Sequence, residues 1–388
     1  MRFPEFTEEW KETKLGKIAE ITKGSGISKD RLSEYGSPCI LYGELYTKYK
    51  SEIINEVYSR TELDSSLLVK SKANDVIIPC SGETAIDIST ARCVPFNNIL
   101  LGGDLNIIRL KNNDGGFFAY QLNGTRKKDI ARVAQGVSVV HLYGENLKHI
   151  RVYHPAIEEQ KKITRLLSLI DKRIATQNKI IEKLQSLIKG LSQQLLSSEN
   201  DWILYRLDDL AQIKSGYSGT QVSYQTPYKV SRIETISKHC IDIQRIGYVE
   251  CIPESYRLNV GNILFSNINS IQYIGNTAYL DKDYGLYHGM NLLRIIPNTT
   301  IVRPRFLHLL LCTDWAINYF QTICNKAVSQ ASINQTALGK SRFPIPPMSV
   351  QQQICSMFEL TERKLDNEQE YISCLQQQKR YLLQKMFI

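Results

Sequence analysis

The sequence predicts an α+β chain in which two tandem globular domains are separated by two long helices that pair as an antiparallel coiled coil. Three observations predict this fold. The chain repeats itself at an interval of about 190 residues, each half begins with short strand-like runs, and each half ends in a sustained heptad pattern. We therefore expect globular domains at 1–156 and 199–346 and helical segments at 157–198 and 347–388.

The internal repeat appears as three blocks that keep the same order in both halves. The blocks pair residues 10–24 with 202–216, 105–109 with 290–294, and 137–163 with 328–354. The interval changes slightly between blocks, as insertions and deletions in loops would make it. Three matches in the same order are poorly explained by chance, so we infer a duplicated unit with approximate two-fold symmetry.

The globular part of each half has the pattern of a mixed α/β domain. Short apolar runs are bounded by turn residues, which is typical of strands. We expect strands at 76–79 and 105–108 in the first half, and at 262–265 and 291–294 in the second. In 305–322, apolar residues recur at intervals of three and four, which predicts a helix.

Each long helix carries a heptad seam, in which apolar residues are spaced alternately by four and three. Gln177 and Glu368 interrupt the two seams at equivalent places, either to fix the register or as solvated breaks. Helices of about 40 residues would be ~60 Å long and need a partner for their apolar stripes. The predicted seam residues are Ile163, Leu167, Ile174, Ile181, Leu184 and Leu191 in the first helix, and Ile354, Phe358, Leu365, Ile372, Leu375 and Leu382 in the second.

Composition excludes several classes of protein. With 43% hydrophobic and 22% charged residues among 388, the chain is expected to fold rather than to be disordered. Its nine cysteines form no Cys-x-x-Cys pair, so we expect free thiols. No apolar run reaches the roughly 18–20 residues of a membrane helix, and the N-terminus has no signal-peptide pattern. We expect a cytoplasmic protein, whose net charge of +9 permits a nucleic-acid partner without requiring one.

Motifs for cofactor, nucleotide or metal binding are absent from the sequence. It has no Gly-x-Gly-x-x-Gly turn and no Asn/Asp-Pro-Pro-Tyr/Phe string of adenine methyltransferases. Residues 338–341 resemble the end of a P-loop, but Asn334 stands where the first glycine is required. The six histidines and the cysteines lack metal-ligand spacing. We therefore expect no metal and no cofactor in this chain, and no catalytic residues.

Polar, aromatic and basic residues occur in loops at corresponding places of both halves. Lys and Arg suit phosphate contacts, whereas Asn, Gln, Ser and Thr can bond base edges. An ordinary solvated loop is the alternative for each residue. The candidate DNA-binding residues are Lys23, Ser25, Lys29, Tyr42, Tyr46, Lys48, Lys50, Ser81, Glu83, Thr84 and Lys127 in the first half, and Lys214, Tyr217, Ser218, Tyr224, Lys229, Arg232, Asn267, Asn269 and Gln272 in the second.

These features together resemble the specificity subunit of type I restriction–modification systems, over nearly the whole chain. The second repeat departs from the pattern, because Asn262 replaces Asp75, Asn267-Ile268 replaces Ser81-Gly82, and no acidic residue precedes Gln351. The motifs that carry the resemblance are Trp10-x4-Leu15-Gly16-x-Ile18, the run Ala73–Thr84, Gly136-Val137-Ser138, and the helix entries Pro155-x4-Gln160-x2-Ile163 and Pro346-x4-Gln351-x2-Ile354.

The resemblance implies a non-catalytic subunit. Each globular domain would be a target recognition domain that reads one half of a bipartite double-stranded DNA site, and the coiled coil would fix the unread gap. Two methyltransferase subunits, which bind S-adenosylmethionine and methylate adenine, would dock on this scaffold. Restriction subunits that use ATP and magnesium could join them, and no membrane is involved.

Two other functions stay open at this point. The chain could be a coiled-coil scaffold that recognises protein or peptide rather than DNA. It could also be a nuclease or methyltransferase with an unrecognised site, for which Asp75 and Glu83 would be the carboxylates to test.

Overall fold

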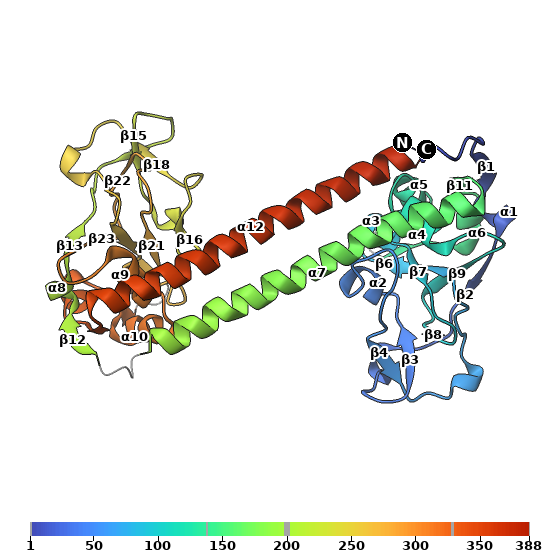
Figure 1. The fold of residues 1–388 in the computed structure, drawn as a ribbon, viewed down its shortest axis with the longest axis horizontal. Coiled ribbons are helices and arrows are strands. Elements are labelled where there is room, and N and C mark those ends of the chain that lie inside the picture. The colour runs from blue at the N-terminus through green and yellow to red at the C-terminus, as the bar shows by residue number, and fades with distance from the viewer. Residues whose placement is uncertain (1, 137–138, 198–201, 327–329, 388) are drawn as a thin grey trace. The chain divides into compact units, whose positions relative to one another are not determined.

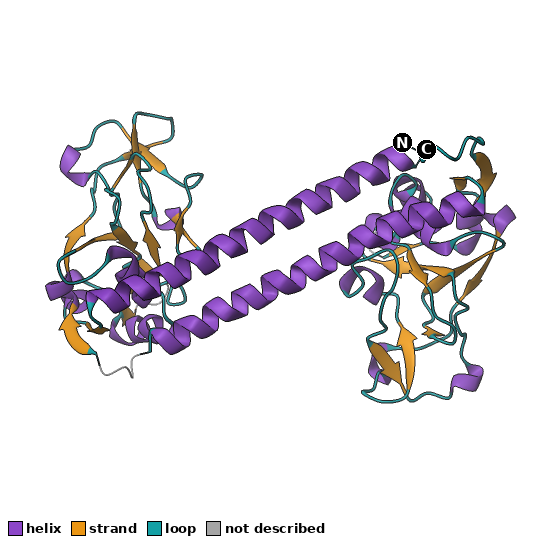
Figure 2. Ribbon diagram, in the orientation of Figure 1, coloured by secondary structure: helices purple, strands orange, loops and turns teal. Residues whose placement is uncertain are grey.

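The computed structural model describes residues 2–136, 139–197, 202–326 and 330–387. The pairs Val137-Ser138 and Val328-Ser329 of the sequence repeat lie outside these ranges. The chain divides into two compact units, which we call unit 1 (1–179 with 369–388) and unit 2 (180–368). Each unit combines small sheets with short helices and with part of both long helices (Figure 2).

Unit 1 is built from short strands and helices of the first half-chain. Its strands are β1 (Lys11–Lys14), β2 (Ala19–Lys23), β3 (Ser37–Ile40), β4 (Ser59–Thr61), β5 (Asp75–Pro79), β6 (Ser81–Gly82), β7 (Arg92–Val94), β8 (Leu100–Leu101), β9 (Leu105–Leu110), β10 (Val140–His141) and β11 (Arg151–His154). Its short helices are α1 (Leu15–Ile18), α2 (Glu44–Thr47), α3 (Ala85–Ile88), α4 (Gly115–Asn123), α5 (Lys127–Arg132) and α6 (Gly144–Lys148), with 3-10 turns η1 (Lys29–Arg31) and η2 (Ser65–Leu67).

Unit 2 repeats this plan with additional short strands. Its strands are β12 (Ile203–Arg206), β13 (Ala211–Ser215), β14 (Gln221–Val222), β15 (Tyr228–Val230), β16 (Ile236–Ser237), β17 (Cys240–Ile241), β18 (Gly247–Val249), β19 (Ile263–Phe265), β20 (Ile268–Asn269), β21 (Thr277–Tyr279), β22 (Leu286–Tyr287), β23 (Leu293–Pro297), β24 (Asn325–Lys326), β25 (Ala331–Ser332) and β26 (Arg342–Ile345). Its short helices are α8 (Leu207–Leu210), α9 (Pro304–Leu311), α10 (Asp314–Ile323) and α11 (Gln335–Gly339), with 3-10 turns η3 (Ile233–Thr235) and η4 (Glu254–Tyr256).

The sheets of the two units correspond in topology. The central sheet has the order β2-β9-β5-β7 in unit 1 and β13-β23-β19-β21 in unit 2. A second sheet contains one parallel pair, β3–β8 or β15–β22. In both units a glycine lies tightly against the backbone of another segment. An added Cβ on Gly24 would lie 2.0 Å from the carbonyl oxygen of Gly102, and one on Gly216 would lie 1.8 Å from that of Gly289. The duplication seen in the sequence is therefore a duplication of fold.

β9 and β23 occupy the same place in the two central sheets, but the residues that correspond in structure differ by two positions from those that the sequence repeat matches. Val76 faces Ile108 in unit 1, and Ile263 faces Ile295 in unit 2, so Ile295 rather than Leu293 corresponds to Ile108. The strand expected at 291–294 accordingly runs from 293 to 297. A shift of two residues keeps every side chain on the same face of the sheet, so hydrophobic alternation could not reveal it.

The prediction of one helix over 305–322 is wrong, because the structure has two separate helices there, α9 and α10. Thr313 lies between them with extended backbone and caps α10, since its Oγ1 accepts the backbone N–H of Ala316 at 3.3 Å. The same hydroxyl donates to the carbonyl oxygen of Leu310 at 2.7 Å, which satisfies the end of α9. A threonine that serves both helix ends favours a break over a continuous helix.

The long helices are α7 (Ile157–Leu195) and α12 (Met348–Met386), each of 39 residues. In unit 1, Ile163 and Leu167 of α7 share a core with Leu382 and Met386 of α12. In unit 2, the second half of α7, including Leu191, packs on the core that contains Ile354 and Phe358 of α12. The beginning of each helix therefore lies beside the end of the other, so the pair is antiparallel (Figure 1).

The remaining seam positions are buried or half-buried within their own unit. Leu375 is buried, whereas Ile174, Ile181, Leu184, Leu365 and Ile372 are half-buried. The two polar interruptions differ, because Gln177 is buried and Glu368 is half-buried in an ion pair with Lys364.

The repeated Pro and Gln of the helix entries make the same contacts in both units. Gln160 Oε1 accepts the backbone N–H of Asp114, the N-cap of α4, at 2.9 Å, and its Nε2 donates to the carbonyl oxygen of Pro155 at 2.9 Å. Gln351 Oε1 likewise accepts the backbone N–H of Arg303, the N-cap of α9, at 2.8 Å, and its Nε2 donates to the carbonyl oxygen of Pro346 at 2.9 Å. The motif thus fastens each long helix to the helix that covers the central sheet.

Candidate nucleic-acid interface

In unit 1, several candidate residues meet where the central sheet ends. The strand β5 leads through Cys80 into β6, which pairs with β10, so that Ser81 lies opposite His141. An added Cβ on Gly82 would lie 2.5 Å from Cγ2 of Ile88, so this turn requires glycine. Thr84 then caps α3, because its Oγ1 accepts the backbone N–H of Asp87 at 3.1 Å. These local constraints hold Glu83 on an exposed turn.

The segment around α2 lies beside this turn. Burial, followed by the charges of Tyr42, Glu83 and Asp87, raises the pKa of Tyr46. Both tyrosines are half-buried, whereas Lys50 is exposed. The tyrosine-rich segment and the turn after β5 are therefore within electrostatic range of each other.

Three candidate residues of unit 1 have structural partners. Lys48 Nζ lies 2.6 Å from Glu44 Oε1 and donates to Ser59 Oγ at 2.9 Å. Ser25 Oγ accepts the backbone N–H of Val69 at 2.7 Å. Lys127 is half-buried, its Nζ donates to Thr90 Oγ1 at 3.4 Å, and burial lowers the pKa of its amine. Lys23 and Lys29 are exposed, so they keep the access that a phosphate contact needs.

In unit 2, the turn after β19 takes the place of the turn after β5. Asn267 is half-buried and its backbone oxygen accepts the N–H of Ile333, which joins β20 to the segment of β25. Asn269 Nδ2 donates to Ser266 Oγ at 3.0 Å, and its Oδ1 accepts the backbone N–H of Ser270 at 2.8 Å. Gln272 is exposed at the tip of this turn. The two asparagines shape the turn, and Gln272 offers its whole amide to a ligand.

The other candidates of unit 2 are spread over the second sheet and the strand β13. Tyr217 packs edge-on against Tyr256 with ring centroids 5.3 Å apart, and Tyr224 donates its hydroxyl to Glu250 Oε1 at 2.6 Å. Arg232 lies 3.6 Å from a carboxylate oxygen of Glu234. The exposed candidates without such partners among the described residues are Lys214, Ser218 and Lys229.

His141 and Tyr143 were missed by the sequence reasoning, which treated His141 only as a possible metal ligand. Both are exposed, and their rings stack with centroids 6.3 Å apart. Because β10 pairs with β6, the two rings lie beside the turn that carries Ser81 and Glu83. No sequence pattern announces a two-residue strand pairing across about 60 residues, so only the fold could reveal this neighbourhood.

The carboxylates named for a catalytic alternative have different surroundings. Asp75 is buried and bidentate to Arg109, with Nε–Oδ1 at 2.9 Å and NH2–Oδ2 at 2.8 Å, and Oδ2 also accepts the backbone N–H of Lys72. Both of its oxygens are therefore engaged in holding β5. Glu83 is exposed and lies on the candidate DNA-binding turn.

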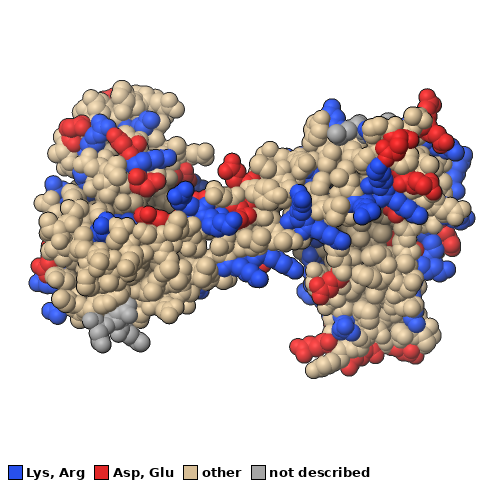
Figure 3. All heavy atoms as spheres, viewed as in Figure 1, with Lys and Arg blue, Asp and Glu red and all other residues tan. Residues whose placement is uncertain are grey.

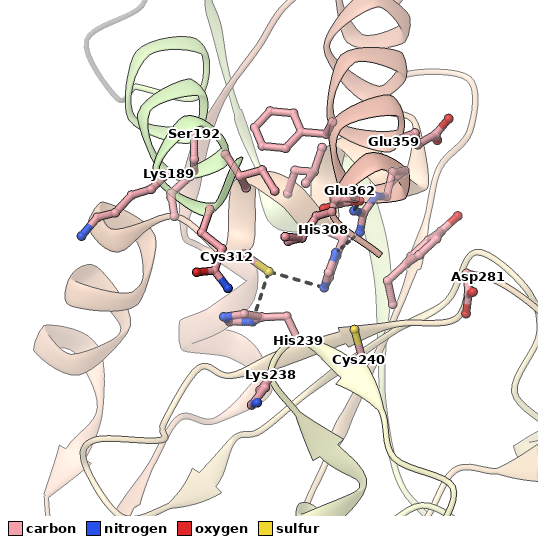
Figure 4. Close-up of a pocket in the computed structure, with 18 of the residues that line it drawn as sticks. Lys189, Ser192, Lys238, His239, Cys240, Asp281, His308, Cys312, Glu359 and Glu362 are labelled. Carbon is pink, nitrogen blue, oxygen red and sulfur yellow. Dashed lines mark hydrogen bonds and ion pairs between the residues drawn. The ribbon is translucent and has the colours of Figure 1, made fainter. Parts of the chain in front are cut away.

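Unit 2 contains an open cavity of about 1140 Å³ beside the two long helices (Figure 4). Cys312 lies at its wall, with its sulfur 3.3 Å from His239 Nδ1 and 3.4 Å from His308 Nε2. Burial raises the pKa of Cys312 to about 12, and burial also lowers the pKa of both histidines. At neutral pH the cluster is an uncharged thiol with neutral imidazoles, so it lacks the thiolate that nucleophilic catalysis requires.

Arg305 fixes the tautomer of His308 in this cavity. The guanidinium can only donate, so His308 Nδ1 accepts from it at 3.0 Å, and Nε2 carries the hydrogen toward Cys312. That ring nitrogen is then unavailable to a metal ion. Among the described residues, no group of three or more His, Cys, Asp or Glu side chains is placed to hold a metal. Within the same ranges, no helix is both long enough and apolar enough to cross a membrane.

Comparison with known proteins explains the duplicated plan. The sequence profile of the family described as "Type I restriction modification DNA specificity domain" matches residues 7–186 and again 199–377. The chain belongs to this family. The two matches cover one globular domain and most of one long helix each, so the family domain is the repeated unit.

Curated members of the type I specificity family show the same relationship. The chain is 38% identical over 193 residues to the putative type I restriction enzyme MjaX specificity subunit of Methanocaldococcus jannaschii. That match covers 48% of this chain and 45% of the relative, so the chain spans less than half of its length in the alignment. The MjaVIII specificity subunit of the same organism is 22% identical over 386 residues, covering 89% of this chain and 84% of that protein.

Solved structures of type I systems share the fold. A specificity subunit from M. genitalium superposes with a TM-score of 0.63 at 16% identity, covering 100% of this chain and 97% of that one. A second solved chain comes from a structure that describes complex assembly and conformational transition of the type I R-M system. It superposes with a TM-score of 0.59 at 15% identity, and the alignment covers 98% of each chain.

The second specificity domain replaces an ion pair of the first by a neutral contact. Where Asp75 binds Arg109 in unit 1, Asn262 Oδ1 accepts Arg294 Nε at 2.8 Å in unit 2. Asn262 Oδ1 also accepts the backbone N–H of Asn259, as Asp75 does for Lys72. The presence of Asn262 where the first repeat has Asp75 therefore removes a negative charge but keeps the hydrogen bond that shapes the turn before the strand.

Proposed function

We propose that this chain is the DNA sequence-specificity subunit of a type I restriction–modification complex. Each globular domain reads one half of a bipartite double-stranded DNA site, and the antiparallel helices set the length of the unread gap. One observation carries this proposal. The two units share a scaffold, yet the turn after β5 exposes Glu83 and Thr84, whereas the turn after β19 exposes Gln272.

The same scaffold with different polar residues is what two readers of different sequences require. Carboxylate and hydroxyl groups bond other base edges than amides do, so each domain would prefer its own bases. A protein-binding scaffold would not need this difference between two copies of one fold.

The partners in this proposal are two methyltransferase subunits, which bind S-adenosylmethionine and methylate adenine. Restriction subunits that require ATP and magnesium join where the system contains them, and the complex acts in the cytoplasm. Large apolar side chains that are exposed to solvent on the long helices support the binding of protein partners. Each of them lies one residue before a position of the heptad seam. These side chains are Leu169, Ile180 and Leu187 on α7, and Met357, Leu360, Tyr371 and Tyr381 on α12.

Catalysis in this proposal belongs to the partner subunits. Asp75 forms a bidentate ion pair with Arg109, and the thiol–imidazole cluster around Cys312 is uncharged at neutral pH. Neither group is prepared for nucleophilic or general-base chemistry.

Genome-wide mapping of methylated adenine tests the proposal. Cells that contain the methyltransferase partner are compared with and without this chain. The expected result is a bipartite, asymmetric motif with a fixed gap that is methylated only when the chain is present. Methylation that does not depend on the chain would contradict the proposal.

Exchange of residues 1–150 for the same region of another specificity subunit adds a stricter test. One half of the methylated motif should change, while the other half and the gap stay the same. A change in both halves would show that the two domains do not read independently.

A further inference from the structure

A row of three cations follows the exposed back of α7 in unit 1. Arg165, Lys172 and Lys179 are seven residues apart, and they lie two residues after Ile163, Ile170 and Gln177, which follow one another along the seam at the heptad interval. Because a helix turns about 100° per residue, this position points away from the partner helix. All three side chains are exposed, and no carboxylate among the described residues pairs with them.

The acids of α7 offset its basic residues only in part, since Glu158 and Glu182 are the two that are exposed. The helix has eight Lys and Arg against four Asp and Glu, whereas α12 has five of each. Two of the four acids are buried and already paired, since Glu159 binds Arg2 and Asp171 binds Lys379. The exposed face of α7 is therefore strongly positive, and the charged side chains that Figure 3 shows over this helix are mostly Lys and Arg.

The row is distinct from the apolar flank of the same helix. Leu169, Ile180 and Leu187 each lie one residue before a seam position, so they point to one side. Protein interfaces are depleted of charged residues at their centre and depend on apolar anchors, which the row lacks. Evenly spaced cations about 10.5 Å apart match a partner whose charge is regular and uniform in sign.

We infer that Arg165, Lys172 and Lys179 bind the phosphates of the unread DNA between the two half-sites. This inference rests on the proposed function and adds a role for the helix, which then holds the gap as well as setting its length. Phosphate contacts position a protein without reading sequence, which is what an unread gap allows.

Salt dependence of DNA binding measures these contacts directly. The full chain is titrated onto a random-sequence duplex of about 40 base pairs between about 50 and 200 mM KCl. In the variant Arg165→Gln/Lys172→Gln/Lys179→Gln, the slope of log K against log salt should become shallower by about 2.7, because each phosphate contact contributes about 0.9. Replacement by Lys or Arg at the same positions should leave the slope unchanged.

A matched variant on α12 controls for net charge. Arg363→Gln/Lys364→Gln/Arg380→Gln removes the same three charges from exposed positions and should leave the slope close to that of the parent. Equal slopes in both triple variants would overturn the inference. So would a normal slope in the α7 variant together with lost binding of the methyltransferase subunit, because the row would then be a protein interface.

The two proposals can fail separately. If the adenine-methylation map shows no dependence on the chain, the specificity function is wrong. If the map shows the bipartite motif while the α7 variant keeps the parental salt slope, only the role of the row is wrong.

Discussion

Lys379 Nζ, near the end of α12, lies 2.6 Å from Asp171 Oδ1 on α7. The same ammonium lies 2.6 Å from Glu52 Oε2, and Tyr120 donates its hydroxyl to Asp171 Oδ2 at 2.6 Å. Burial, followed by the charge of Glu52, raises the pKa of Asp171. Burial alone lowers the pKa of Lys379, but the two carboxylates outweigh it and raise that pKa. One half-buried cation, held between two buried carboxylates, therefore joins both long helices to the loop that carries Glu52.

Replacement of Lys379 by methionine should destabilise the protein strongly. The change leaves Asp171 and Glu52 buried together without their cation, and loss of one partner of a buried pair costs about 3–5 kcal/mol. Urea unfolding measures the loss. Lys364→Met is the matched control, because this exposed lysine pairs with Glu368 on the same helix and should cost no more than about 1 kcal/mol. Equal losses in the two variants would contradict the buried cluster.

Gln160→Ala should destabilise unit 1, and Gln351→Ala should destabilise unit 2 in the same way. Each change leaves the N–H of a half-buried helix N-cap residue without its acceptor, which costs about 1–3 kcal/mol where water does not replace that acceptor. Thermal unfolding of the single variants measures the effect. Gln352→Ala provides the control, since this exposed glutamine bonds only Ser356 among the described residues. If the control is equally harmful, the helix-entry contacts do not have the role assigned here.

His288 should make the stability of unit 2 depend on pH. Burial lowers the pKa of His288 to about 4 from an ordinary value of 6.5, and its Nε2 bonds the carbonyl oxygen of Leu292 at 3.0 Å. Between pH 4 and 6.5 the unfolded chain binds the additional proton, so stability rises with pH across this window and is lost as pH falls. The contribution is about 3 kcal/mol. In His288→Gln, calorimetric melting temperatures should vary less over this range. An unchanged pH profile would show that His288 is not the responsible group.

Insertion of one heptad into each long helix should lengthen the gap of the recognised site. Seven residues add ~10.5 Å, which corresponds to about three base pairs of duplex. Insertion of seven residues preserves the apolar seam, whereas insertion of five would rotate it away from the partner helix and should disrupt folding. Methylation maps of the seven-residue variant give the new gap directly. An unaltered gap would mean that something other than the helices sets the distance.

The duplicated plan was predictable from sequence because its signals are strong and local. Heptad spacing, turn residues at strand ends and the repeated Gln160 and Gln351 each have a direct physical meaning, and the family match confirms the overall identification. The two-residue shift between β9 and β23 was hidden, because it leaves the alternation of faces unchanged. The break at Thr313 was missed, because the apolar spacing continues through it.

The candidate interface was less accessible to sequence reasoning. Loop composition identified Glu83 and Gln272, which are exposed, but it could not show that Lys48 is paired with Glu44 or that Ser25 bonds the backbone of Val69. It also could not bring His141 beside Ser81, because this contact depends on tertiary pairing. Which of these side chains touch DNA stays a prediction for the binding and methylation experiments.

The assembly of unit 1 from both ends of the chain has a consequence for its biosynthesis. Leu382, Met386 and Phe387 complete the core formed by the first 170 residues, and Phe387 contacts the ring of Trp10. At about 5–20 residues per second, a ribosome needs roughly 10–40 s after residue 179 to make these side chains. During this interval the N-terminal part of unit 1 has an uncovered apolar surface, so its core is completed only after α12 has been synthesised.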